Sequence, residues 1–135
     1  MFQRRITHAL SGDAASEDVR SRCAAGRALS GGVVLTEREI VYTLKYRRVY
    51  LPYDSIVWAY RQVQESRLSF GRGGVLQEHR VVMVCRDGAR SAAVFQREEY
   101  ASAALAKISE CNPSVAVGYT AENRERFAAL TEHRE

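Results

Sequence analysis

Histidine and cysteine are the residue types in this sequence that most often act in catalysis and metal binding. None of them stands at a spacing that suits either role. They are His8, His79, His133, Cys23, Cys85 and Cys111. No histidine stands at the close spacing to a cysteine or a second histidine that a zinc site needs. A nucleophilic thiolate needs a nearby base and exposure to solvent, whereas Cys85 falls in an apolar run. We therefore predict a non-enzymatic protein with no catalytic residue, no cofactor and no metal, and interpret the cysteines as buried thiols.

Two other motifs have the composition of a functional site but lack the neighbouring secondary structure or side-chain geometry that such a site needs. The stretch from Phe70 to Gly74 is glycine-rich, as phosphate loops are. A phosphate loop leads from a strand into a helix, however, and here an extended segment follows, so we interpret the stretch as a flexible hairpin connection. Glu98 and Glu99 are adjacent and diverge by about 100° around a helix axis, so they do not form an acid/base pair. Their interaction with the helix dipole is a sufficient explanation.

Basic residues form the first candidate contact surface. The chain has 20 lysines and arginines against 16 acids, a formal net charge of +4. Acidic residues are interleaved with them throughout, which argues against a nucleic-acid partner, because phosphate binding needs cations gathered on one face. The densest basic cluster is Lys45, Arg47 and Arg48 beside Tyr46. We interpret it as a solvated strand end, with contact to an anion or a nucleic acid as the alternative.

The segment 64–77 is the second candidate contact surface. It has no helical or extended pattern, contains three glycines, and carries Phe70 between Arg67 and Arg72. Long connections of this kind are often kept for recognition. We therefore take Arg67, Phe70 and Arg72, together with the basic cluster, as possible interaction residues.

The length and composition are those of one globular domain. Of the 135 residues, 46% are hydrophobic and 27% are charged, which is ordinary for a folded chain. No run approaches the roughly 18 apolar residues of a membrane span, and the first residues lack the apolar segment of a signal peptide. We expect a cytoplasmic protein, with an N-terminal arm of unassigned structure over 1–15 and a single α+β domain over 16–135.

The first half of this domain is predicted to hold one helix and three strands. Ser16 has the residue type of an N-cap, and the acids at 17–18 suit a helix N-terminus, so a helix is expected to about Ala28. After the glycine pair at 31–32 the sequence becomes rich in β-branched and aromatic residues. The expected strands are 33–36, 39–45 and 48–52.

The second half is predicted to hold three longer strands and two helices. Ile56, Trp58 and Tyr60 should share one face of a central strand over 56–63. Strands 79–85 and 91–95 should form a hairpin at Asp87-Gly88, because glycine takes the positive φ of a tight turn. From 97, a buried helical stripe is expected at Ala101, Ala104, Leu105 and Ile108, ended by Asn112-Pro113. A short apolar run at 115–117 and a helix from Thr120 complete the chain.

Three segments resemble an uncharacterised bacterial family with pleckstrin-homology-like (PH-like) domains. They are Asp54-Ser-Ile-Val-Trp-Ala-Tyr60, Val81-Val-Met-Val-Cys-Arg-Asp-Gly88 and Cys111-Asn-Pro-Ser-Val-Ala-Val-Gly-Tyr119. The resemblance implies an α+β fold with a strongly curved antiparallel sheet or partial barrel of about six to seven strands, capped by an amphipathic helix. Additional N-terminal and C-terminal helices are expected around it. A different α+β sheet is the alternative, because about six strands precede the main helix and one follows it.

The expected function is a non-enzymatic protein-interaction or scaffold module. It would bind a protein partner, or a copy of itself, through a sheet edge or the 64–77 loop. One alternative is a small enzyme with a site that cannot be recognised from sequence, which a pocket of convergent titratable groups would favour. The other is a binder of an anionic ligand, nucleic acid or membrane surface, which arginines gathered on one face would favour.

Overall fold

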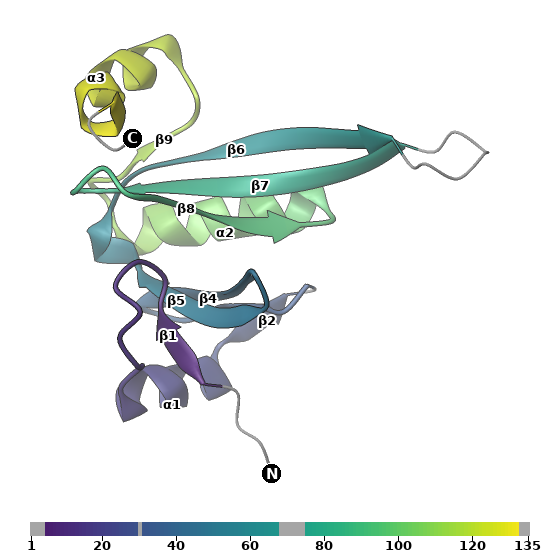
Figure 1. The fold of residues 1–135 in the computed structure, drawn as a ribbon, viewed down its shortest axis with the longest axis vertical. Coiled ribbons are helices and arrows are strands. Elements are labelled where there is room, and N and C mark those ends of the chain that lie inside the picture. Colours follow the sequence, from purple (N-terminus) through teal and green to yellow (C-terminus); the bar gives the residue numbers. More distant parts are fainter. Residues whose placement is uncertain (1–4, 30, 68–74, 133–135) are drawn as a thin grey trace.

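The computed structural model describes residues 5–29, 31–67 and 75–132, which form two mixed β-sheets and three α-helices (Figure 1). In chain order the elements are β1 (Ile6–His8), α1 (Glu17–Ala25), β2 (Arg27–Leu29), β3 (Val33–Leu35), β4 (Glu39–Leu44), β5 (Arg47–Pro52), the 3-10 helix η1 (Tyr53–Ser55), β6 (Ile56–Arg67), β7 (Val75–Cys85), β8 (Arg90–Phe95), α2 (Glu98–Cys111), β9 (Ala116–Val117) and α3 (Ala121–Glu132). The first sheet has the order β1-β5-β4-β3-β2, and the second has the order β8-β7-β6-β9.

The sheets differ from the single antiparallel sheet that the sequence predicted. The α+β class is confirmed, but the strands divide between two sheets, neither of which is closed. Each sheet also contains one parallel pair, β1 with β5 and β6 with β9. The expectation was wrong because β1 and β9 are very short strands from the two ends of the chain. Their pairing depends on distant partners and leaves little periodic signal in the sequence.

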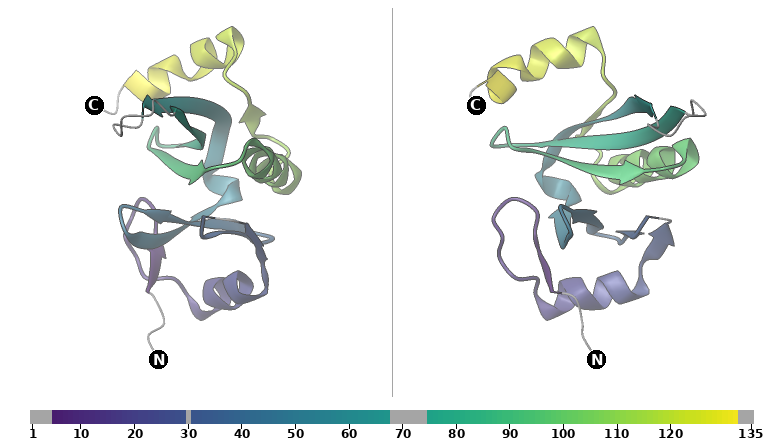
Figure 2. Two further views of the ribbon diagram at one scale, coloured as in Figure 1. Left: turned by 90° about the vertical axis from the view of Figure 1, so that its right-hand side faces the viewer. Right: turned by 45° about the vertical axis from the view of Figure 1, so that its right-hand side comes forward.

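The helices lie in three different layers (Figure 2). α3 covers part of the outer face of the second sheet, α2 lies on the inner side of that sheet, and α1 lies beyond the first sheet. The end of α2 is fixed by Asn112, whose Nδ2 donates to the carbonyl oxygens of Tyr53 at 2.8 Å and Ile56 at 2.9 Å. Those two residues mark the corner between the sheets. The predicted helix end at Asn112-Pro113 is therefore confirmed, and α2 is held at the junction of the sheets.

The N-terminal arm is part of the first sheet. Ile6–His8 runs parallel to the segment 48–50 of β5. The arm then returns so that the N–H of Ala15 donates to the carbonyl oxygen of Ile6 at 2.8 Å. Next, Ser16 caps α1 as predicted, because its Oγ accepts from the N–H of Val19 at 3.3 Å. The arm thus runs along β5 and leads directly into the start of α1.

α1 ends earlier than predicted because β3 approaches it closely. A Cβ added at Gly26 would lie 2.7 Å from Val34 Cγ1 and 2.9 Å from the carbonyl oxygen of Leu35. Gly26 adopts an extended conformation, and the next residues, Arg27–Leu29, pair with β3 as β2. The helix expected to reach Ala28 is therefore replaced by a strand. With β2 included, seven strands of the described chain follow α1 and precede α2 in the sequence.

A β-bulge near the start of β6 changes which side chains face the core. The pairing of β6 with β7 shifts register between Ile56 and Trp58. Ile56 packs in the core between the sheets, whereas Trp58 and Tyr60 belong to a separate cluster on the outer face. The prediction that these three residues share a face was wrong, because an inserted residue reverses the alternation of side chains beyond it.

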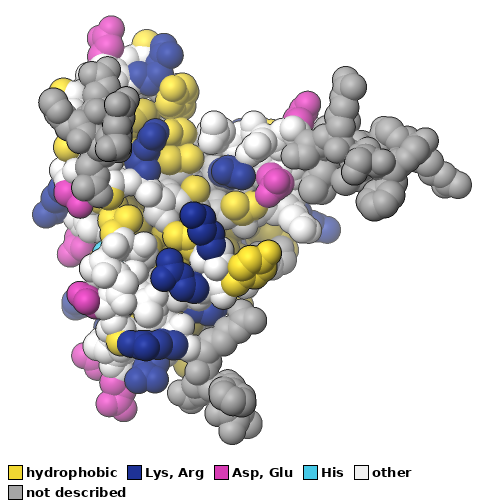
Figure 3. Space-filling view, in the orientation of Figure 1, with side chains coloured by type: hydrophobic (Ala, Val, Ile, Leu, Met, Phe, Trp, Pro, Cys, Tyr) yellow, Lys and Arg dark blue, Asp and Glu magenta, His cyan; other side chains and the backbone are white. Residues whose placement is uncertain are grey.

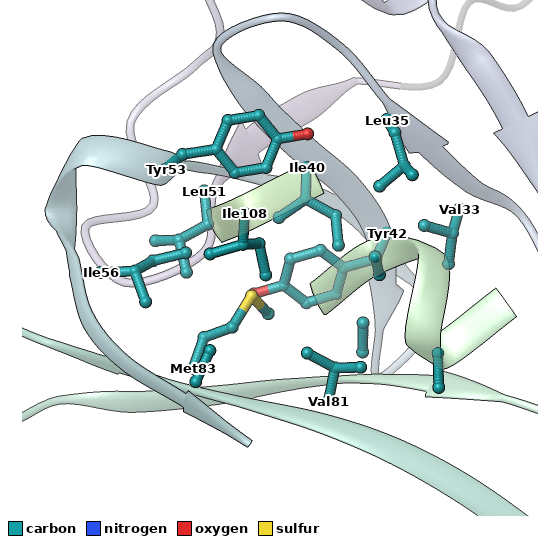
Figure 4. Close-up of a cluster of buried hydrophobic side chains, with 14 of the residues drawn as sticks. Val33, Leu35, Ile40, Tyr42, Leu51, Tyr53, Ile56, Val81, Met83 and Ile108 are labelled. Carbon is teal, nitrogen blue, oxygen red and sulfur yellow. The ribbon is translucent and has the colours of Figure 1, made fainter. Parts of the chain in front are cut away.

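The main core fills the space between the two sheets and α2 (Figure 4). Tyr42, Leu51, Met83 and Ile108 come from β4, β5, β7 and α2, and their side chains point toward one another. Each is fully buried, and burial of such a side chain contributes about 1.5–3 kcal/mol. The Tyr42 hydroxyl is hydrogen-bonded to Ser91 Oγ at 2.5 Å, so the polar end of this buried ring is satisfied.

The buried face of α2 follows the predicted stripe with one exception. Ala101, Ala104 and Ile108 are fully buried, but Leu105 is only partly buried at the margin of the core.

The three cysteines differ in how deeply they are buried. All three are free, Cys85 is buried as predicted, and Cys23 and Cys111 are half-buried. The prediction was wrong for these two because each lies near the end of a helix, where neighbouring elements cover it incompletely.

A second, smaller core lies under α3. Trp58 stacks on Phe127 with ring centroids 5.3 Å apart, and its indole N–H donates to the carbonyl oxygen of Gly118 at 2.8 Å. Tyr119 stacks on the same indole at 5.8 Å. The aromatic pair Trp58 and Tyr60 is therefore buried in the contact between α3 and the second sheet.

Candidate functional site

The β6–β7 hairpin extends well into the segment that was expected to be a loop. Paired residues run as far as Arg67 opposite Val75, so both strands enter the range 64–77. The expectation of an unpatterned connection was wrong because the end of β6, Gln64 to Arg67, carries polar residues on both faces. Gln77 Nε2, for example, donates to Glu65 Oε1 across the strands at 3.2 Å. A period of two appears in a sequence only where one face is buried, so the extension gave no signal.

The predicted interaction residues are not gathered at one place. Arg67 is the last residue of β6, while Phe70 and Arg72 lie outside the described residues. Lys45, Arg47 and Arg48 lie at the turn between β4 and β5, in the other sheet. Arg48 is already engaged, because its Nη1 donates to the carbonyl oxygen of Gly32 and to Thr43 Oγ1. Arg48 therefore braces the turn.

The candidate site is the outer edge of β6, meaning the edge of the strand that faces away from β7. β9 pairs with β6 only at Trp58 and Ala59, and within the described part of the chain no strand continues along this edge. The N–H of Gly118 donates to the carbonyl oxygen of Ala59 at 2.9 Å, so the backbone groups of Ala59 point toward β9. Because backbone groups alternate in direction along a strand, those of Arg61, Val63 and Glu65 also point outward, away from β7. These N–H and C=O groups are free to pair with an added strand.

The side chains along this edge are open to solvent. Gln62, Val63, Gln64 and Glu65 are all exposed, and Val63 retains 47% of its surface in contact with water. Arg61 is held on the inner face, where its Nη1 contacts Glu98 Oε1 at 2.5 Å at the start of α2. The edge thus offers backbone hydrogen-bonding groups flanked by one apolar and several polar side chains. Sequence reasoning named a sheet edge but could not choose this one.

A polar cavity of about 470 Å³ lies between α1, β4 and η1. Glu39, only 2% exposed, accepts from Arg22 Nη2 at 2.6 Å and from Arg22 Nε at 2.9 Å, and it also contacts Thr36 Oγ1. These hydrogen bonds raise the pKa of Arg22. Burial raises the pKa of Tyr53 above its usual range, and its hydroxyl donates to the carbonyl oxygen of Thr36 at 3.0 Å. The carboxylate is occupied by its partners, so the cluster joins α1 to the first sheet.

A second cavity brings together residue types found in cysteine hydrolases, but its thiol is not activated. His8, Cys85 and Asp87 line it, with a volume of about 390 Å³. Burial raises the pKa of the Cys85 thiol, which opposes formation of the nucleophilic thiolate. His8 Nδ1 accepts from the backbone N–H groups of Leu10 and Ser11, each at 3.2 Å. Neither cavity therefore has the chemistry of a catalytic centre.

The described residues contain no group of three histidine, cysteine or acidic side chains placed to hold a metal ion. Nor does any helix within 5–29, 31–67 and 75–132 have the length and apolar character needed to cross a membrane. The fold and its open edge define a small α+β domain with an accessible strand. The chain belongs to the family described as a domain of unknown function (DUF6709), which matches residues 3–127. No curated protein and no solved structure matches it.

Proposed function

We propose that this domain is a non-enzymatic protein-interaction module that accepts a strand from its partner along the outer edge of β6. The observation that carries the proposal is the length of this edge. β6 spans 12 residues, whereas β9 covers it at only two positions, Trp58 and Ala59. A strand added there would hydrogen-bond to the outward groups of Arg61, Val63 and Glu65.

The other sheet edges support this choice. β1 and β2, which end the first sheet, have three residues each, and β9 has two. β8 has six residues, but it lies against the first sheet, where Ser91 is hydrogen-bonded to Tyr42. Short or covered edges are the usual protection against unwanted pairing. The edge of β6 lacks both kinds of protection over the described residues, which favours its use in binding.

A proline scan tests the proposal, because proline removes one backbone donor. Val63→Pro removes an outward N–H while leaving the hydrogen bonds to β7, so we expect the partner to be lost with little change in melting temperature. Val63→Ala is the matched control and should bind. Gln64→Pro removes an inward N–H and should lower the melting temperature instead. A pull-down with each purified variant measures how much partner is retained. If Val63→Pro retains as much partner as Val63→Ala, the proposal is refuted.

We also propose that the arrangement is PH-like and the protein cytoplasmic. Support for the fold comes from the strand series β2 to β8, in which four strands belong to the first sheet and three to the second. Consecutive strands are antiparallel within each group, and α2 follows directly. This order is what the resemblance noted in the sequence implies. An experimental structure compared with PH-like domains would test it.

Binding of a small anion is a second candidate function. A cavity of about 460 Å³ lies between the β4–β5 turn and the second sheet and is lined by Lys45 and Arg90, together with Tyr60, Gln62, Ser91 and apolar side chains. Lys45 and Tyr46 have φ angles of 49° and 69°, a left-handed conformation that is costly without glycine or asparagine. Figure 3 shows lysine and arginine side chains across the middle of one face, with acids mostly at its rim.

Titration with inorganic phosphate tests this second candidate. Lys45→Gln and Arg90→Gln should each weaken binding, while Arg20→Gln, an exposed site on α1, should not. The single tryptophan, Trp58, contacts Tyr60 with ring centroids 4.6 Å apart, so its fluorescence can report occupation of the cavity. Equal affinity in all three variants would show that the cavity is not an anion site.

A further inference from the structure

We propose that the partner of the β6 edge is a second copy of this chain, paired antiparallel to the first through residues 60–66. The inference rests on the proposed function and names its partner. The residues centred on Val63 read Arg61-Gln-Val-Gln-Glu65. The types are symmetric about the valine, except that the two ends carry opposite charges. Such a segment is complementary to its own copy when the two run in opposite directions.

The backbone allows this pairing. Arg61, Val63 and Glu65 point their N–H and C=O groups outward, and outward residues that meet in an antiparallel pair exchange two hydrogen bonds. When Val63 lies opposite the same residue of the second copy, Arg61 lies opposite Glu65, and Glu65 lies opposite Arg61. The register gives about six main-chain hydrogen bonds around a two-fold axis.

The side chains agree with the same register. Arg61, Val63 and Glu65 project from one face of the strand, so two opposite-charge pairs would flank a contact between valines. The exposed Val63 would be covered by its counterpart. Arg61 uses Nη1 for its contact with Glu98, which leaves other guanidinium donors for the incoming carboxylate. On the opposite face, Gln62 would lie across from Gln64, where their amides can hydrogen-bond.

Other symmetric registers are less favourable. Centring the pair on Arg61 places two guanidinium groups opposite each other, and centring it on Glu65 places two carboxylates opposite each other. In this register the pairing must end with residue 60 opposite residue 66, because the copy's Arg67 would lie opposite Ala59, which β9 already pairs with. Moving the copy further toward the start of β6 is therefore blocked. Charge and the end of β9 therefore select the register centred on Val63.

Charge exchange between two variants tests the register. Sedimentation equilibrium of the wild type over a micromolar-to-millimolar series should show a monomer–dimer equilibrium. Glu65→Arg and Arg61→Glu should each weaken self-association by about tenfold or more, because like charges then face each other. An equimolar mixture of the two variants should recover association, since each cation of one chain then faces a carboxylate of the other.

The controls separate charge from folding. Arg20→Glu changes an exposed residue of α1 by the same charge and should dimerise like the wild type. Glu65→Arg removes only the exposed hydrogen bond from Gln77, so its melting temperature should change little and its result stands even if Arg61→Glu unfolds. Failure of the wild type to dimerise, or of folded variants to associate on mixing, overturns the inference.

A further outcome separates this inference from the proposed function. One such outcome is that an unrelated extended peptide protects the Val63 amide from hydrogen exchange while the protein itself stays monomeric. That result would overturn self-pairing but keep the proposed edge binding. Absence of both self-association and Val63 protection by partners recovered in the pull-down would overturn both.

Discussion

Arg22 donates from two nitrogens to both carboxylate oxygens of Glu39, so the last turn of α1 is fastened to the first residue of β4 by a bidentate ion pair. The carboxylate is almost completely buried, while the Arg22 side chain is 32% exposed. The pair sits at the rim of the first sheet and fixes the position of α1 on it.

Removal of one partner should be costly. Arg22→Ala leaves the buried Glu39 without its cation, and we expect a loss of about 2–3 kcal/mol in the free energy of unfolding, reduced from the fully buried case by solvent at the arginine. Urea denaturation measures it. Arg20→Ala, exposed on the same helix, should change stability by less than about 0.5 kcal/mol. Similar losses in both variants would show that the ion pair contributes nothing specific.

Stability should fall in alkaline solution because of Tyr42. Burial raises its pKa to about 12 from the ordinary value of 10. Below pH 10 both states keep the proton, so this ring gives no pH dependence there. Between pH 10 and pH 12 the unfolded state loses a proton that the folded state retains, so stability decreases by up to about 1.4 kcal/mol per pH unit. Denaturation across this range should show a smaller slope for Tyr42→Phe than for Tyr46→Phe, whose ring is exposed. Equal slopes would exclude Tyr42 as the cause.

Two positions of α2, three residues apart, should respond differently to a charge. Ile108 is fully buried, so Ile108→Asp should destabilise the fold by more than about 4 kcal/mol or prevent folding. Leu105 is only partly buried, and Leu105→Asp should cost about 1–2 kcal/mol because its carboxylate can reach water. Melting curves distinguish them. A Leu105→Asp variant as unstable as Ile108→Asp would place Leu105 inside the core.

Hydrogen exchange should alternate along β6. In dilute protein the amides of Arg61, Val63 and Glu65 should exchange quickly, while those of Gln62 and Gln64, bonded to β7, should be protected. NMR at a concentration below self-association measures each amide. Fast exchange at all five positions would mean that the hairpin is frayed there, and protection at all five would mean that the edge is already covered.

The parts of the fold that were predictable are those encoded by neighbouring residues. The N-cap at Ser16, the end of α2 at Asn112 and most of its buried stripe depend on local chemistry and on a period of 3.6 residues. By contrast, β2 forms because Gly26 lets β3 come close, which is a contact between distant segments. The faces of β6 were misassigned because nothing local marks a bulge.

The candidate site was only partly predictable for the same reason. The hypothesis that a sheet edge binds a partner came from the sequence, but the choice of edge required the topology. The β6 residues from Gln62 to Glu65 are exposed on both faces, and hence show no alternation in hydrophobicity. The buried state of Glu39 was missed because its partner, Arg22, lies 17 positions away in the sequence.

The bulge in β6 also bears on how this family can change in length. Ile56 pairs with Cys85 and Trp58 pairs with the adjacent Val84, so Val57 is the surplus residue. Deleting Val57 would leave a regular ladder in which Ile56 still faces the main core and Trp58 still faces α3. Deleting a residue between Ala59 and Val63 would reverse the faces of part of the strand. Among related chains, gaps at the start of this strand should therefore gather at position 57.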